Sequence, residues 1–234
     1  MKKSNEVYNC IGTGLGDVLG GLMLYHRWSI EQNVIIRVST WYPRGAKRKD
    51  YAGKAHELLP LIDSPGQVEL TDEAPTSCHP PAEGIANPFY PSVVRWCPSD
   101  SKTVCYQFDG KSHKEKNFTS FEDWGEIAGF LCGLGYEPVR LGNHLSLQEC
   151  MDLLAGSAAF VGVPSGMGVL NFAVGAPHFM IRNGLGAEWL KTVMYGPFML
   201  MRDKWQFQRL FGLFHENGYE FFRKWCLHPE LCRF

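Results

Sequence analysis

The chain lacks several features that would place it in a common class of protein. Its eight cysteines include no Cys-x-x-Cys pair, and several lie in apolar segments, which favours reduced thiols over a disulfide framework. It has no apolar signal segment at its start and no hydrophobic run of membrane-spanning length, so we expect a cytoplasmic protein, in the host cytoplasm if it is viral. A formal net charge of -1 gives no whole-molecule attraction to nucleic acid, although it does not exclude a local basic patch.

The sequence also gives little indication of a metal site or of a catalytic cysteine. The nearest set of metal-ligand types is Cys226, His228 and Cys232, which has no fourth member at zinc spacing. No cysteine stands on a recognised nucleophile turn, and His79 and His113 are well explained as exposed loop residues. We therefore expect neither a metal ion nor another cofactor.

Length and pattern indicate an α/β protein with two domains. With 234 residues, 45% hydrophobic, the chain can bury a core in one large or two small domains. Strand and helix patterns alternate along it, as in βαβ units. In the first half we expect strands at 7–11, 34–38 and 67–70, and helices at 16–31 and 54–59.

The second half repeats this alternation after a proline-rich stretch from 75 to 98, which we interpret as loop and as the crossing between domains. Expected strands are at 103–108, 138–141, 160–163 and 177–181, and expected helices are at 120–133, 146–154, 169–174 and 204–225. Ser146 and Glu149 form a capping-box pattern at one helix start. The predicted organisation is an N-terminal α/β domain at 1–99, a C-terminal α/β domain at 100–200 and a closing helical segment at 201–234.

A glycine-rich turn near the start is the most informative stretch. The run from Cys10 to Gly21 passes from an apolar strand through three spaced glycines into a helix whose first turn contains Asp17. Glycines let backbone amides approach a ligand, and a helix start adds the positive end of a dipole, so we expect a ligand site there. The turn is not a dinucleotide fingerprint, because Asp17 stands in place of the third glycine, and no Gly-Lys-Ser/Thr of a phosphate loop follows.

Asp17 is the candidate catalytic residue of this turn. A carboxylate beside bound pyrophosphate would be repelled, so Asp17 is better placed to face a neutral hydroxyl, which is the position of a general base. The alternative is a tight strand-to-helix connection in which Asp17 only favours the helix dipole, by roughly 0.3 to 1 kcal/mol.

A second glycine turn lies at 164–168, after the expected strand at 160–163. Open parallel sheets bind ligands at the carboxyl ends of strands, so the backbone amides of this turn are candidates for holding an anion. Lys111, Ser112 and Lys116 follow the strand at 103–108 and would add donors. The alternatives are close helix packing for the glycines and solvated loop charges for the lysines.

Three stretches together resemble the heptosyltransferase-like branch of the GT-B glycosyltransferases. Residues 14–19 look like that family's first Gly-Asp turn, 116–124 like its Lys-x-aromatic-Pro segment, and 154–168 with 173–177 like its donor motif, Gly-x-Asp-Ser/Thr-Gly-x-x-His. Two positions depart from the motif, because Pro164 replaces the family aspartate and Val169 the family histidine.

The resemblance implies two Rossmann-like lobes of GT-B type with a cleft between them and a small N-terminal lobe. It further implies a metal-independent, inverting hexosyl- or pentosyltransferase that takes a nucleotide-sugar as substrate, with Asp17 activating an acceptor hydroxyl and Lys116 contacting the donor diphosphate. The donor-binding residues expected on this basis and from the glycine turns are Gly14, Gly16, Asp109, Lys111, Ser112, Lys116, His144, Ser165, Gly166, Met167 and Gly168.

A basic, aromatic segment at 41–51 is the candidate acceptor site, through Trp41, Arg44, Lys47 and Arg48. Cations interleaved with aromatic rings can hold phosphates and stack on an exposed base. An acceptor of this kind would be a hydroxymethylated base in bacteriophage DNA, turned out of the stack. The segment would equally suit an anionic saccharide or a lipid-linked acceptor, and on its own it reads as a solvated loop.

Two further functions stay open at this point. One is a non-catalytic module that binds a nucleotide or nucleotide-sugar, which the replacements at Pro164 and Val169 suggest. The other is a Rossmann-like oxidoreductase, which binding of NAD would indicate.

Overall fold

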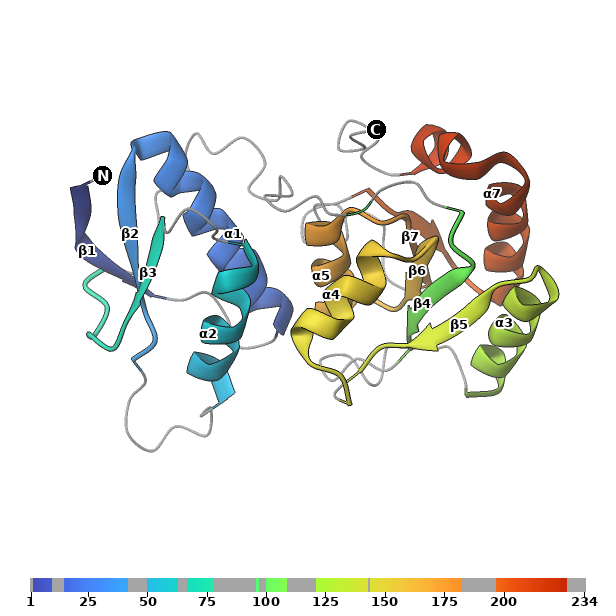
Figure 1. The fold of residues 1–234 in the computed structure, drawn as a ribbon, viewed down its shortest axis with the longest axis horizontal. Helices are drawn as coiled ribbons and strands as arrows, with labels where there is room; N and C mark the ends of the chain where they lie inside the picture. Colours follow the sequence, from blue (N-terminus) through green and yellow to red (C-terminus); the bar gives the residue numbers. More distant parts are fainter. Residues whose placement is uncertain are drawn as a thin grey trace. The chain divides into compact units, whose positions relative to one another are not determined.

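The structure, a computed structural model, describes residues 2–9, 15–41, 50–62, 67–77, 96, 100–108, 121–142, 144–181 and 197–226. Contacts divide the chain into two compact units, 1–93 and 94–234. Each unit has its own parallel β-sheet with helices packed on it (Figure 1). The predicted α/β fold of two Rossmann-like units is therefore confirmed, while the cleft between them stays a prediction.

The first unit is a three-stranded parallel sheet in the order β1-β2-β3, formed by β1 (Lys2–Asn9), β2 (Val34–Ser39) and β3 (Val68–Thr71). Helices α1 (Leu15–Gln32) and α2 (Asp50–Ile62) pack against each other on one face of this sheet (Figure 1). The predicted βαβ unit is confirmed, with β1 shifted toward the start of the chain. 

Alternation along the strands explains why one face of this sheet is apolar. Ile36 and Val38 are fully buried, and the ring of Tyr8, the register partner of Val38, lies 5.0 Å from the ring of Trp28 on α1. The opposite face carries charged side chains, including an ion pair between Lys3 and Glu69 at 2.6 Å.

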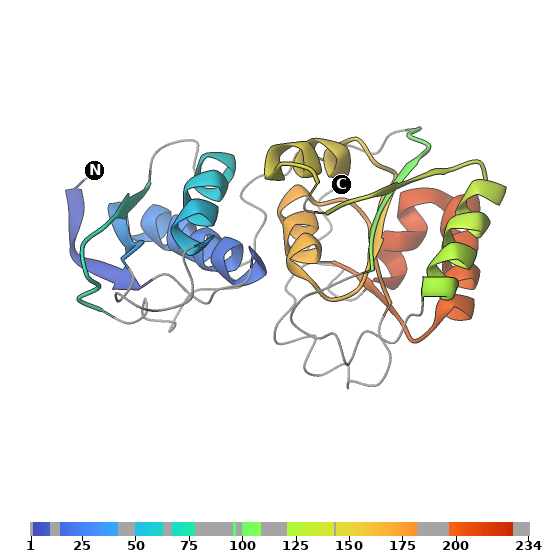
Figure 2. The same cartoon turned by 90° about the horizontal axis from the view of Figure 1, so that it is seen from below.

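The second unit is a five-stranded parallel sheet in the order β5-β4-β6-β7-β8. Its strands are β4 (Thr103–Gln107), β5 (Glu137–Arg140), β6 (Ala159–Gly162), β7 (His178–Ile181) and β8 (Met199–Met201). Helices α4 (Leu147–Ala155) and α5 (Gly166–Val174) cover one face, and α3 (Phe121–Gly133) and α7 (Lys204–Trp225) cover the other (Figures 1 and 2). Strand β5 lies on one side of β4, and the next strand in the chain, β6, lies on the other side of β4. The strand order therefore reverses between β4 and β6.

Phenylalanine rings attach helix α7 to the sheet. The ring of Phe179 in β7 lies 5.0 to 6.2 Å from four rings of α7, those of Phe207, Phe211, Phe214 and Phe222. The helical segment matches the predicted span but is kinked at Gly218, where φ is 68°, and it packs against α3, β7 and β8. The resemblance also implies that this closing helical segment crosses back to the first unit, and that contact stays a prediction.

Among the described residues, none of the helices combines the length and apolar character that crossing a membrane requires.

Candidate functional site

The carboxyl ends of β4 and β6 meet where the strand order of the second sheet reverses. In open α/β sheets, ligands bind outside the carboxyl edge at this switch point. Strand β4 ends at Gln107, and Gln107 is the register partner of Gly162 at the end of β6. The glycine turn at 164–168 therefore starts where such folds bind ligands.

Gly162 is required at this position because the neighbouring backbone comes very close. A Cβ on Gly162 would lie 2.8 Å from the carbonyl oxygen of Gln107 and 2.8 Å from the ring of Phe160. The next residue, Val163, donates its amide to the same Gln107 oxygen at 3.1 Å. The end of β6 is thus fixed tightly against β4 just before the turn.

Ser165 is the N-cap of helix α5. Its hydroxyl accepts a hydrogen bond from the Gly168 amide at 3.3 Å and donates one to Gln107 Oε1 at 2.5 Å. The cap occupies the amide of Gly168, whereas the amides of Gly166 and Met167 belong to the first turn, which intrahelical bonds cannot satisfy. These two amides, at the positive end of the helix dipole, suit an anionic group.

Pro164 and Val169, which depart from the motif that this turn resembles, have different surroundings. Val169 packs against the buried cluster of Phe172, Met180 and Phe198, so its side chain serves the packing of α5 on β7. Pro164 is half-buried in the turn before α5. Ser165 therefore has the one polar side chain in this turn, and the other groups available to a ligand are backbone amides and carbonyls.

His144 lies at the same edge, in the turn between β5 and α4, and its side chain is exposed. Hydrogen bonds from the backbone and hydroxyl of Ser146 lower the pKa of Glu149, and His144 adds a smaller electrostatic effect in the same direction. The capping box predicted for these residues is confirmed, since Ser146 caps α4 and Glu149 bonds back to the Ser146 amide. 

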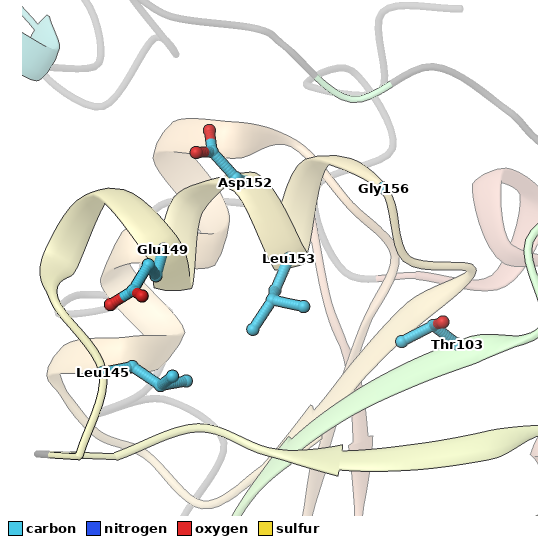
Figure 3. A pocket seen from close by; sticks show the side chains of 6 residues that line it. All are labelled: Thr103, Leu145, Glu149, Asp152, Leu153 and Gly156. Atoms are coloured by element: carbon cyan, nitrogen blue, oxygen red, sulfur yellow. The ribbon is translucent and has the colours of Figure 1, made fainter.

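A pocket of about 460 Å³ lies along α4 (Figure 3). Leu145 and Leu153 point toward the strands, whereas Asp152 points away from them (Figure 3). Asp152 accepts a hydrogen bond from Gln148 at 2.7 Å. Thr103 at the other end of the pocket begins β4, so the pocket extends away from the switch-point edge. Its two carboxylates are those of Glu149, which bonds to the Ser146 amide, and Asp152.

The first sheet has a polar carboxyl edge of its own. Asn9, Ser39 and Thr71 are register partners at the ends of its three strands. Asp17 lies in the first turn of α1, the helix that follows β1. The backbone of Asp17 therefore lies in the helix that begins at the carboxyl end of this sheet.

Trp41 follows β2 at this edge and is 45% exposed. Beside it, the Thr40 hydroxyl donates to the Asp72 carboxylate at 2.8 Å, and the Ser39 hydroxyl donates to the Glu73 carbonyl at 2.6 Å. Sequence reasoning named Trp41 but missed Thr40 and Asp72, and it also missed Gln107 at the other edge. In the sequence, each of them is recognisable only as a polar residue at the end of a strand or directly after it.

Several predicted site residues lie outside the described residues, or have side chains that do. These are Gly14, Asp109, Lys111, Ser112, Lys116, Arg44, Lys47 and Arg48, together with the side chain of Asp17. The structure brings together Ser165, Gly166, Met167 and Gly168 at the switch point, and it places Gly16 in the first turn of α1.

Within the described ranges, no group of three or more His, Cys, Asp or Glu side chains is arranged to hold a metal ion. Cys226 is buried at the end of α7, and its predicted companions His228 and Cys232 lie outside the described residues. Cys105, Cys132, Cys150 and Cys226 are free thiols, and burial raises the pKa of Cys105 to about 12.

No protein-family model matches the chain, and no curated protein sequence is significantly similar to it. Among solved structures, the iron-containing dodecameric glycosyltransferase TibC of enterotoxigenic E. coli is similar over 77% of this chain and 58% of its own, with 18% identity and a TM-score of 0.51. Our chain thus spans less than two thirds of that protein. 

Two further structures give lower scores. TibC in complex with ADP-D-beta-D-heptose has 17% identity and a TM-score of 0.47 over 78% of this chain and 60% of its own. The E. coli heptosyltransferase WaaC with ADP-2-deoxy-2-fluoro heptose has 15% identity and a TM-score of 0.38 over 84% and 70%. At these identities the comparisons show a shared fold alone, and the similarity to the first TibC structure confirms the predicted GT-B type of α/β fold.

Proposed function

We propose that the protein transfers a sugar from a nucleotide-sugar to an acceptor hydroxyl. The observation that carries this proposal is the start of α5 at the switch point of the second sheet, with Ser165 as its cap and Gly162 fixed against Gln107. This is a backbone site for an anionic group, and it lies in a fold shared with a glycosyltransferase.

The chemistry follows from the charge that develops on the leaving nucleotide diphosphate. Fixed donors must stabilise that charge, and one such donor is typically worth about 3 to 4 kcal/mol in the transition state. The amides of Gly166 and Met167 supply donors here, and we assign Lys111 and Lys116 to the same diphosphate. Because amides and lysines meet this need, we propose a transfer that uses no metal.

Asp17 is the proposed general base. It would take the proton of the acceptor hydroxyl while that oxygen attacks the anomeric carbon from the side opposite the leaving group, which inverts the configuration. Its place in the first turn of α1 fits this role, because α1 begins at the carboxyl end of the first sheet.

Donor binding and turnover test the proposal. We expect one of the UDP-, GDP-, ADP- or CMP-sugars to raise the melting temperature of the protein, since a ligand that binds only the folded state stabilises it. Asp17→Asn should then reduce transfer or donor hydrolysis by at least roughly 100-fold, with the thermal shift retained. Glu31→Gln, which alters another carboxylate of α1, is the matched control. Unchanged turnover in Asp17→Asn would refute the assignment of the base.

A non-catalytic nucleotide-sugar-binding module is the second candidate. It is favoured by Val169, which packs against a buried cluster at the position where the resembled motif has a histidine, and by Pro164 in place of the aspartate. Tight nucleotide binding with no turnover of any sugar donor, with or without acceptor, would support it over the enzyme.

A further inference from the structure

The pocket of about 460 Å³ along α4 lies apart from the switch point, and its lining combines apolar and negatively charged groups (Figure 3). We call it the α4 pocket. Its volume is in the range of small-molecule sites. The described residues of its lining include neither lysine nor arginine; they are Thr103, Leu145, Glu149, Asp152, Leu153 and Gly156. 

Two leucines form the apolar part of the α4 pocket. Leu145 and Leu153 are half-buried, and both point toward the strands beneath the helix (Figure 3). A ligand that covers them removes apolar surface from water, which is worth about 25 cal/mol for each Å². An inorganic ion gains nothing from such a surface, so the pocket suits a ligand with a hydrocarbon part.

Glu149 supplies a fixed negative charge to the pocket. Its Oε2 accepts hydrogen bonds from the amide and from the hydroxyl of Ser146, both at 2.7 Å. These bonds lower the pKa of Glu149, so the carboxylate is ionised at neutral pH. Both bonds end on the same oxygen, and a carboxylate has about four lone-pair sites, so Oε1 of Glu149 keeps the capacity to accept from a ligand.

Two further groups extend the negative potential along the pocket. Asp152 is exposed and accepts one hydrogen bond, from Gln148 to its Oδ1 at 2.7 Å. Gly156 is the C-cap of α4, where the helix dipole is negative, and the last turn of this helix has no basic residue. In the part of the chain that the structure describes, neither Glu149 nor Asp152 forms an ion pair with a lysine or arginine.

We propose that the α4 pocket binds an aliphatic ammonium ion, with its hydrocarbon stem on Leu145 and Leu153 and its charge at Glu149. An ammonium group has three donors, and a charge-assisted hydrogen bond to Oε1 of Glu149 would use one of them. The negative lining repels phosphates, so this pocket is not a second site for the nucleotide-sugar. The inference is independent of the proposed sugar transfer and adds a second ligand to the protein.

The neighbouring edge strand favours a free amine over a lysine on a partner protein. Strand β5 is the edge of the sheet beside Thr103, whose register partner is Glu137. An extended segment of a partner would add to this edge through backbone hydrogen bonds. Strand β5 has only four residues, and Pro138 among them has no N–H to donate, so the edge is poorly suited to such pairing.

The test uses the full chain with ¹³C-methyl-labelled leucine and follows the methyl signals without any nucleotide-sugar. The signals missing in Leu145→Ile and Leu153→Ile identify the two leucines of the pocket, and the signal missing in Leu213→Ile identifies an exposed leucine of α7 as an internal control. The probes are n-butylamine hydrochloride and its neutral analogue n-butanol, each up to about 50 mM at constant ionic strength, because ligands of so few atoms bind weakly. A third probe is the acetylated and amidated tripeptide Gly-Lys-Gly.

We expect n-butylammonium to shift the Leu145 and Leu153 signals saturably and to leave the Leu213 signal in place. Glu149→Gln should weaken its binding roughly tenfold, the effect of losing a hydrogen bond to a charged group. Glutamine serves in a capping box as glutamate does, so α4 keeps its N-terminal cap in this variant. Glu216→Gln, which removes an exposed carboxylate of α7, is the matched control and should leave the affinity unchanged.

Asp152→Asn is a second variant of the pocket. It retains an oxygen that can accept from Gln148, and it should weaken n-butylammonium about two- to fivefold, the effect of removing a solvated charge.

Four results overturn the proposal. The first is that n-butylammonium moves neither leucine signal of the pocket, and the second is that n-butanol binds as tightly as the ammonium ion. The third is that Glu149→Gln and Asp152→Asn both keep the affinity of the parent protein. The fourth is tighter binding of the lysine tripeptide than of the free amine, which would assign the pocket to a partner protein. Nucleotide-sugar binding and turnover are separate measurements, so the failure of either proposal leaves the other in place.

Discussion

His178 allows a sharp test of how burial affects the stability of the second unit, because its imidazole is buried among aromatic rings. The residue is fully buried in β7, and its ring lies 5.0 Å from the rings of Phe160 and Phe172 and 6.4 Å from that of Phe198. Within the part of the chain that the structure describes, neither ring nitrogen has a hydrogen-bond partner. Burial lowers the pKa of His178 from 6.5 to about 3.

This pKa makes the stability of the unit depend on pH. Between pH 6.5 and 3 the folded protein keeps His178 neutral, whereas the unfolded chain binds a proton there. The unfolded state thus binds more protons, and the free energy of unfolding falls as the pH falls through this window. The gap between the two pKa values corresponds to about 2 kcal/mol lost at pH 5 and about 5 kcal/mol when the loss is complete.

We expect His178→Leu to remove this dependence. Leucine is close to histidine in volume and leaves no buried nitrogen unsatisfied, so the variant should be more stable by about 1 kcal/mol at pH 7.5. Its advantage over the parent protein should grow by about 2 kcal/mol at pH 5. Urea unfolding of both proteins at the two pH values measures this double difference, in which the titration of all other groups cancels.

The exposed His144 provides the control, since His144→Leu removes an imidazole from the same unit without changing the burial of a charge. If His178→Leu and the parent protein lose equal stability between pH 7.5 and pH 5, the reasoning about this buried ring is wrong.

Three further predictions concern the switch point and the thiols. Gly162→Ala should cost at least about 2 kcal/mol, because the new methyl would meet the Gln107 carbonyl at 2.8 Å, and a lowered melting temperature would show it. Ser165→Ala removes the cap of α5 and should cost about 1 kcal/mol in urea unfolding; an unchanged midpoint would contradict the capping role. At pH 8 a thiol reagent should modify Cys132, which is exposed, and spare the buried Cys105, whose pKa is about 12, as peptide mass mapping can determine.

Local patterns were enough to predict most of the elements. The capping box of α4 was predictable because Ser146 and Glu149 are three residues apart and make both of their bonds to each other. Helix α7 was predictable because its apolar positions recur at helical spacing, and they do pack on β7. Strand β8 was missed, since three residues, Met199–Met201, are too short for a periodicity to show.

The site was less predictable, because its contacts join distant parts of the chain. Ser165 was predictable from the glycines around it. Its hydrogen-bond partner Gln107 is 58 residues away, and the two residues come together only through the pairing of β4 with β6. Thr40 and Asp72 are likewise 32 residues apart and meet through the pairing of β2 with β3. Each of these residues looks locally like any polar residue at the end of a strand.

The turn before α5 offers mainly backbone groups to a ligand. Ser165 caps the helix, and Gly166 and Gly168 add no side chain to its first turn. Val169, at the position where the motif that the turn resembles has a histidine, packs against the buried cluster of Phe172, Met180 and Phe198. A donor held here would depend on main-chain amides and on cations from elsewhere, because the turn itself adds no charged side chain. Backbone amides cannot distinguish one nucleotide diphosphate from another. Under the proposed function, discrimination between donors therefore depends on contacts to the base and the sugar, outside residues 164–168.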